Sequence, residues 1–156
     1  MAVRIEVITA SSPQAAGAGG GGSSSRPQDD MMISIKQKRL IDKILTLESK
    51  IKIPIRNISS LRYAEPTIIE DRKRLGMSRA VGLRYGKRYI VGTYVEWERE
   101  KVTFWNIHSK DAAAEKRVLI MELRNERYNE IILEVDDCER VMGELRQVLG
   151  QDVITR

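Results

Sequence analysis

The stretch KRVLIMELRNERYNEIILEVDDCERVMGEL, residues 116–145, decides the fold class. It contains two apolar runs rich in Ile, Leu and Val, within 116–124 and 129–136, and each has the length of a strand. The polar sequence NERY between the runs indicates a short connection. We therefore predict two consecutive strands here.

The end of this stretch and the residues after it change to helical spacing. An apolar stripe runs from Val141 to Leu149, and the carboxylates of Asp136 and Asp137 can accept hydrogen bonds from the free N–H groups of a first helical turn. We predict a C-terminal helix at about 137–149 whose stripe closes the open end of a β-structure.

Two further strands are predicted upstream, at 88–97 (RYIVGTYVEW) and 101–108 (KVTFWNIH). A parallel α/β fold would need a helix between successive strands, and no helical pattern separates these segments, so we expect an antiparallel meander. The aromatics around this hairpin suit a core. Because Phe104 and Trp105 are adjacent, they face opposite ways, which could leave one of them exposed to a partner.

The first part of the chain adds a strand at 2–9 with alternating apolar residues, then a Gly/Ser-rich segment at 10–29. We expect this segment to be a flexible loop between the first strand and the second, which begins with MMISI. Pro54 lacks an N–H donor, so the strand IKIPI belongs at a sheet edge or contains a bulge.

An inserted helix is predicted at about 36–48, where the chain again takes helical spacing. Its apolar residues share one face and are Leu40, Ile41, Ile44, Leu45 and Leu47. We expect this face to pack on the body of the protein. A basic amphipathic helix lying on a membrane is the alternative, although large aromatics are missing from it.

These elements predict a mainly β protein with some α content, an antiparallel barrel or sandwich of about seven strands. The inserted helix at about 36–48 and a C-terminal capping helix at about 137–149 complete it. The length of 156 residues fits a single domain, 1–156.

The order of short structural motifs supports a resemblance. The motifs are Gly92-Thr93-Tyr94, Phe104-Trp105, Glu122-Leu123, Tyr128 and Asp136-Asp137. Over about residues 31–149 the chain resembles the small prokaryotic pleckstrin-homology-like (PH-like) domain proteins. The resemblance implies a closed sheet capped by the last helix and little about function, since these domains are mostly uncharacterised. Eukaryotic relatives bind phosphoinositides through a basic motif on the first two strands and their loop, but this loop contains only Arg26, so that ligand is not carried over.

The net charge of +5 comes from one stretch, because the chain has 27 Lys and Arg against 22 Asp and Glu. Between residues 72 and 88 lie seven basic residues and no acid: Arg72, Lys73, Arg74, Arg79, Arg84, Lys87 and Arg88. We treat these residues as the candidate surface for an anion or a partner, on a loop. Interleaved glycines, Tyr85 and Tyr89 suit contacts with phosphates, whereas a solvated loop and a protein contact are the alternatives.

The sequence contains few residues in an arrangement that supports catalysis. Cys138 is surrounded by carboxylates that oppose a thiolate, and His108 is expected to be solvated or locally hydrogen-bonded in a turn. One Cys and one His do not make a zinc site, and GAGGGG lacks the end of a phosphate-binding loop. We predict no enzyme, no catalytic residue, no metal and no cofactor.

The sequence thus favours a non-catalytic interaction module that binds a protein partner or forms homo-oligomers, and no small-molecule substrate is identified. The alternative is a binder of anionic surfaces, nucleic acid or acidic lipid, through the basic residues of 72–88. A single cysteine and the lack of a long apolar segment favour the cytoplasm, with peripheral membrane association as an option.

Overall fold

The structure is a computed structural model that describes residues 3–9, 31–74, 77–85, 89–109, 111–149 and 153, without the side chains at positions 9, 45, 72–74, 77 and 98. Its smaller sheet has the order β1-β2-β3, with β1 (Val3–Thr9), β2 (Met31–Gln37) and β3 (Lys50–Pro54). The larger sheet has the order β4-β8-β9-β7-β6-β5. Its strands are β4 (Ile58–Tyr63), β5 (Met77–Tyr85), β6 (Tyr89–Glu96), β7 (Lys101–Ile107), β8 (Val118–Leu123) and β9 (Glu130–Glu134).

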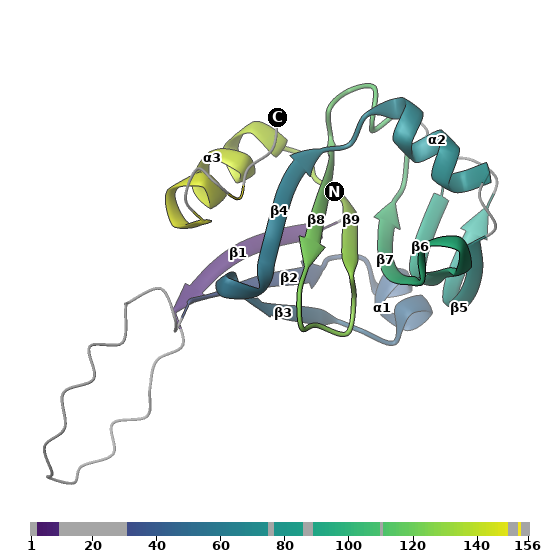
Figure 1. Ribbon diagram of the computed structural model, residues 1–156, viewed down its shortest axis with the longest axis horizontal. Coiled ribbons are helices and arrows are strands. Elements are labelled where there is room, and N and C mark those ends of the chain that lie inside the picture. Colours follow the sequence, from purple (N-terminus) through teal and green to yellow (C-terminus); the bar gives the residue numbers. More distant parts are fainter. Residues whose placement is uncertain are drawn as a thin grey trace, which may run out of the picture.

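Three helices accompany the sheets in the described residues: α1 (Leu40–Thr46), α2 (Pro66–Arg74) and α3 (Cys138–Leu149). Short 3-10 turns follow β3 (Ile55–Asn57) and β6 (Trp97–Arg99). Figure 1 shows α3 and α2 at opposite ends of the larger sheet, and β1 to β3 crossing beside it. The mainly β class is confirmed, but the nine described strands form two sheets and no closed barrel.

Both faces of the larger sheet are buried, which corrects the expectation for its aromatics. Phe104 packs in a core with the smaller sheet and α3, whereas Trp105 packs in a second core with residues of α2. Both side chains are fully buried. The alternation across the strand was predicted correctly, but exposure of one ring was not, because each face has its own cover.

The second half is not a simple meander. β6 and β7 are antiparallel, as are β8 and β9, but β7 and β9 pair in parallel, with Phe104 opposite Ile131. The chain passes from β7 to β8 across the position that β9 later fills, and this places β8 beside β4.

The basic segment expected to be a loop contains an edge strand, β5, which pairs with β6 over its length. Gly82 and Gly92 face each other there with φ of 135° and 139°. A Cβ on Gly82 would lie 2.5 Å from the Cα of Gly92, so the two strands can approach this closely only through paired glycines.

β3 is an edge strand, as Pro54 predicted, and lies beside β2. β1 pairs antiparallel with β2, and the residues between them, 10–30, lie outside the described part. The apolar stripe of α3 packs against the β-structure as predicted, because Val141, Met142 and Leu145 are buried in the same core as the smaller sheet.

Candidate functional site

The predicted basic surface is only partly visible. Lys87 and Arg88 lie outside the described residues, and Arg72, Lys73 and Arg74 are described only as backbone at the end of α2. Arg79 and Arg84 are exposed on β5.

These two arginines lie on one face of the hairpin, because they pair with Tyr94 and Ile90, which are four residues apart on β6. Burial raises the pKa of Tyr94, and the charges of Arg79 and Arg84 act in the opposite direction. Tyr89, one residue before Ile90, faces the other way, toward α1. The described part of the basic stretch therefore points away from α1.

A buried polar network lies beneath α1. Asp42, which is 0% exposed, accepts a hydrogen bond of 2.7 Å from the hydroxyl of Tyr89. The ring of Tyr89 meets that of His108 edge-on, with centroids 4.9 Å apart. His108 Nε2 lies 3.2 Å from Asp42 Oδ2 and donates a 2.8 Å hydrogen bond to Oδ1 of Asn106. Of the two expectations for His108, the local hydrogen bond is confirmed by Asn106, whereas solvation is wrong because the side chain is only 7% exposed; its closeness to Asp42, far away in the sequence, was not predicted.

The contacts of His108 identify its protonation state. The guanidinium of Arg39 can only donate, and it lies 3.1 Å from Nδ1, so we assign a neutral ring with its proton on Nε2. Burial lowers the pKa of His108, and Arg39 adds to this effect, whereas Asp42 and Glu134 act in the opposite direction. The hydrogen bonds of Asp42 with Tyr89 and of Arg39 with His108 tie α1 in one orientation to β6 and to the end of β7.

This orientation turns the described apolar residues of the predicted face outward, contrary to the prediction that they pack on the body, while the side chain of Leu45 lies outside the described part. The exposed fractions are 72% for Leu40, 56% for Ile41, 63% for Ile44 and 79% for Leu47, just after the helix. The buried side of α1 is polar in the described residues. It consists of Asp42 and of Thr46, which accepts a hydrogen bond from Gln37.

The surroundings of this apolar helix face are cationic. Residues 36–52 contain six Lys and Arg and two acids, Asp42 and Glu48. Asp42 is buried, and Glu48 accepts hydrogen bonds from Arg127 and from Tyr128. Both acids therefore accept hydrogen bonds from other residues of the protein, and the charged groups that this segment presents to solvent are mainly cations.

A row of cations crosses the smaller sheet next to α1. Arg4 of β1 is opposite Lys36 of β2, and Lys36 is opposite Lys50 of β3. A hollow of about 470 Å³ lies at this end of the sheet. Its described lining consists of five cations, Arg4, Lys36, Lys38, Lys43 and Lys50, and of two neutral polar residues, Gln37 and Ser49.

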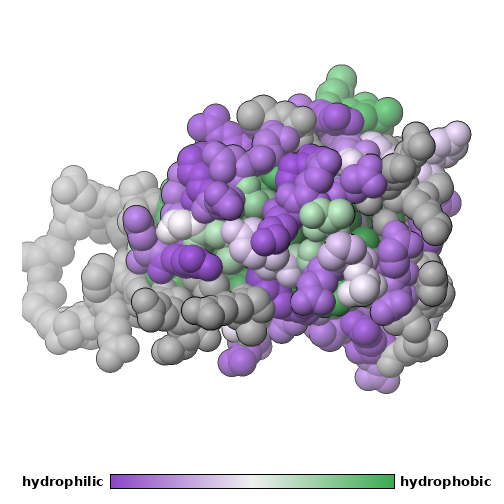
Figure 2. All heavy atoms as spheres, turned by 90° about the horizontal axis from the view of Figure 1, so that it is seen from above, coloured by the Kyte–Doolittle hydropathy of each residue, from purple (hydrophilic) through white to green (hydrophobic). Residues whose placement is uncertain are grey.

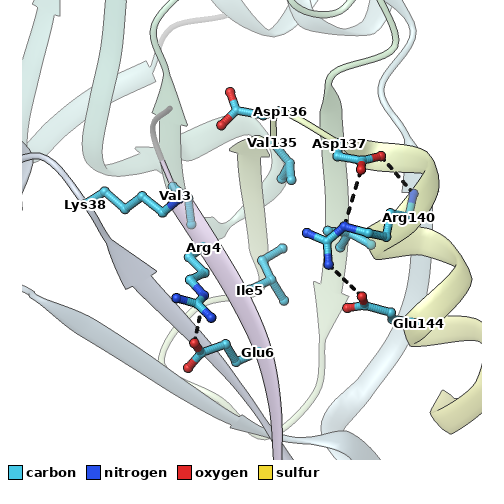
Figure 3. Close-up of a pocket in the computed structure, with 11 residues that line it drawn as sticks. Val3, Arg4, Ile5, Glu6, Lys38, Val135, Asp136, Asp137, Arg140 and Glu144 are labelled. Carbon is cyan, nitrogen blue, oxygen red and sulfur yellow. Dashed lines mark hydrogen bonds and ion pairs between the residues drawn. The ribbon is translucent and has the colours of Figure 1, made fainter.

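A second hollow, of about 380 Å³, lies between β1 and the start of α3 (Figure 3). Its charges are mixed and satisfy one another. Arg140 bonds Asp137 and Glu144, and Arg4 bonds Glu6, as the dashed lines show. This hollow is therefore a poor site for an ion.

Other candidate chemistry is weak. In the described part of the chain, no group of three His, Cys, Asp or Glu side chains could hold a metal ion. Burial raises the pKa of Cys138 to about 12, and the thiol bonds the carbonyl of Val135. Burial, more than the neighbouring carboxylates, thus disfavours the thiolate of Cys138. The search of the described helices finds none with the length and hydropathy needed to cross a membrane.

Comparison with models of protein families, with curated proteins and with solved structures finds no match. The function must therefore be argued from the site alone.

Sequence reasoning offered the outward face of α1 only as the alternative of a helix lying on a membrane, and it missed the cationic hollow. The clustered lysines of KQKR and SKIKIP were a usable signal. Their meeting with Arg4 depends on strand register, which the sequence does not display.

Proposed function

We propose that this protein is a non-catalytic module that attaches to anionic membrane surfaces through the exposed face of α1. The observation that carries the proposal is the set of four solvent-facing aliphatic side chains, Leu40, Ile41, Ile44 and Leu47, within a cationic surround. Figure 2 shows a face that is mainly hydrophilic, with a group of strongly hydrophobic atoms projecting at its upper edge.

The apolar part supplies the binding energy in this proposal. Fully burying one Leu or Ile side chain is worth about 1.5–3 kcal/mol, so four side chains at these exposures offer roughly 4–8 kcal/mol before the losses of association. Tyr85, at 76% exposure, pairs with Tyr89 beneath α1 and adds an aromatic ring near the helix. Tyrosine suits the boundary between water and lipid, because its ring is apolar and its hydroxyl polar.

The charges supply the preference for anionic lipid. Arg39 and Lys43 flank the apolar face, and Lys36, Lys38 and Lys50 lie on the same segment or beside it. Each cation near an anionic surface is worth about 1 kcal/mol at low salt. Apolar side chains and cations together are typical of helices that lie in the membrane interface.

A lipid surface suits this site better than nucleic acid does. Single-stranded nucleic acids are bound by stacking on aromatic rings, whereas the side chains on α1 are aliphatic. The four aliphatic side chains on and just after α1 are 56–79% exposed, so they are available to enter a fluid interface.

The PH-like class is part of the same proposal. Its support is the motif order in the sequence, the mainly β plan of two sheets, and the C-terminal helix packed on one core. A cytoplasmic location with peripheral membrane association is likewise proposed, on the lone cysteine and the surface of α1.

Co-sedimentation with vesicles tests the function. We expect the protein to bind vesicles of phosphatidylcholine mixed with phosphatidylserine, and to bind pure phosphatidylcholine vesicles much more weakly. The double variant Leu40→Ser/Ile44→Ser should lose about 3 kcal/mol, roughly a hundredfold in partitioning. Both residues are exposed, so its fold should be retained, which circular dichroism would check.

Trp97→Ser is the matched control. Trp97 is also an exposed apolar residue, at 67%, but it lies at the end of β6 remote from Tyr89 and α1. Equal vesicle binding by wild type and the Leu40→Ser/Ile44→Ser variant would overturn the proposal. So would a dimer in solution that this variant dissociates while no vesicles are bound, because the face would then be an interface between copies.

A further inference from the structure

We propose that the cationic hollow between β1, β2, β3 and α1 is a binding site for a phosphate-bearing anion with at least two negative charges. The inference rests on the proposed function for its source of phosphate, a phosphomonoester lipid headgroup at the membrane. A free phosphate compound carries the same chemistry, and the experiment below separates the two sources.

The first argument is the unbalanced row of charges. Side chains opposite each other on adjacent strands lie about 5 Å apart at Cβ, and like charges in such pairs are destabilising. Here Arg4, Lys36 and Lys50 occupy three adjacent strands at one register. The row therefore carries repulsion that a bound anion would remove.

One carboxylate relieves part of this repulsion. Glu6 accepts a hydrogen bond of 2.6 Å from Lys36 and forms an ion pair with Arg4 at 2.8 Å. The bond from Lys36 is the main cause that lowers the pKa of Glu6, and Lys50 contributes by its charge. Glu6 can balance one cation, so the row keeps a net positive charge.

The second argument is the composition of the hollow. Lys38, just after β2, and Lys43 of α1 also line the hollow, and no acid belongs to the described lining. Its volume of about 470 Å³ lies within the usual range for small-ligand sites, about 300–1,000 Å³. A guanidinium offers paired donors to phosphate oxygens and ammonium groups offer point charges, so this set suits phosphate better than a single carboxylate.

The third argument is position. Arg4 is the second residue of β1 and Lys36 is near the end of β2. The hollow therefore lies at the end of the sheet remote from the β1–β2 connection, which joins Thr9 and Met31. Lys43 belongs both to the hollow and to α1. A headgroup in the hollow would therefore lie next to the helix whose aliphatic face we propose to enter the lipid.

The first measurement is a titration of the isotope-labelled full chain with inorganic pyrophosphate, followed by amide NMR at constant ionic strength. We expect saturable shifts at Lys36, Lys38, Ser49 and Lys50. The variant Lys36→Met/Lys50→Met should bind at least about tenfold more weakly, since each removes a charge-assisted contact. Lys52→Met is the control, because Lys52 pairs with Ser34 outside the hollow.

The second measurement compares vesicles containing phosphatidic acid with vesicles containing phosphatidylserine at equal total charge. A preference for phosphatidic acid that Lys36→Met/Lys50→Met abolishes and Lys52→Met retains would identify the lipid headgroup as the source. Pyrophosphate binding without any vesicle binding would support the hollow, with a free phosphate compound as ligand, and would refute the membrane function.

The opposite result separates the two proposals in the other direction. Vesicle binding could depend on Leu40 and Ile44 without any headgroup preference, while pyrophosphate causes no saturable shift. This pair of results would overturn the hollow as a site and would still support the membrane function. Equal pyrophosphate binding by wild type and Lys36→Met/Lys50→Met would also overturn it.

Discussion

Replacing Gly82 by alanine should strongly destabilise the protein. A Cβ at this position would lie 2.2 Å from the carbonyl oxygen of Val91 and 2.5 Å from the Cα of Gly92. Both contacts are with backbone, so no side chain can rotate away to relieve them. The φ of 135° is also one that alanine rarely adopts.

The magnitude follows from these two effects. A residue other than glycine in such a conformation costs about 1–3 kcal/mol, and an overpacked contact costs about 1–3 kcal/mol more. We expect a loss of about 4 kcal/mol in the free energy of unfolding. For a chain of this length that corresponds to a melting temperature lower by roughly 10 °C.

Gly143→Ala provides the matched control. Gly143 lies in α3, and a Cβ there would meet no atom within 4 Å. Alanine should therefore stabilise the helix by about 0.5–1 kcal/mol. Urea unfolding can be followed by the fluorescence of the fully buried Trp105. If Gly82→Ala were as stable as the wild type, the close approach of β5 and β6 described above would be wrong.

Three further predictions concern buried groups. Stability should fall as the pH drops below the ordinary His pKa of 6.5, because the pKa of His108 is lowered in the folded state and the unfolded chain takes up the proton first. Urea unfolding at several pH values should show this slope, and His108→Gln should flatten it; an unchanged slope would assign it to other groups. Glu134→Ala should cost about 3 kcal/mol in the same assay, since Glu134 accepts hydrogen bonds from Arg117 and from the backbone of His108 and Ser109; a loss no larger than for an exposed acid such as Glu144 would contradict this. Cys138, with its pKa raised to about 12 by burial, should react with a thiol reagent only as fast as the chain unfolds, and rapid labelling of the native protein would show that the thiol is accessible.

Elements that depend on local patterns were predictable from the sequence. The apolar runs that form β8 and β9 and the apolar stripe of α3 are each patterns of neighbouring residues. The structure has these elements close to the predicted positions. Pairing over long distances was not predictable. In the pair of β4 and β8, Leu61 meets Met121, sixty residues later, and β9 then inserts between β8 and β7, where it runs parallel to β7.

The orientation of α1 shows why the candidate site was missed. Its apolar stripe predicts an inward face by the usual rule for amphipathic helices. The rule fails because polar residues of α1 bond to strands of the two sheets. Asp42 accepts a hydrogen bond from Tyr89 of β6, and Thr46 accepts one from Gln37 of β2. Tertiary hydrogen bonds thus decide the face that points outward, and only the structure displays them.

No described side chain of α1 belongs to either hydrophobic core. The described side chains of α1, a set without Leu45, attach the helix through hydrogen bonds to β6 and β2, so we expect it to open locally at a free energy below that of global unfolding. Hydrogen bonds are directional, so they give α1 a defined angle, but they hold the helix only weakly to the rest of the protein. Such local opening would let these seven residues adjust their angle to the surface that the helix meets.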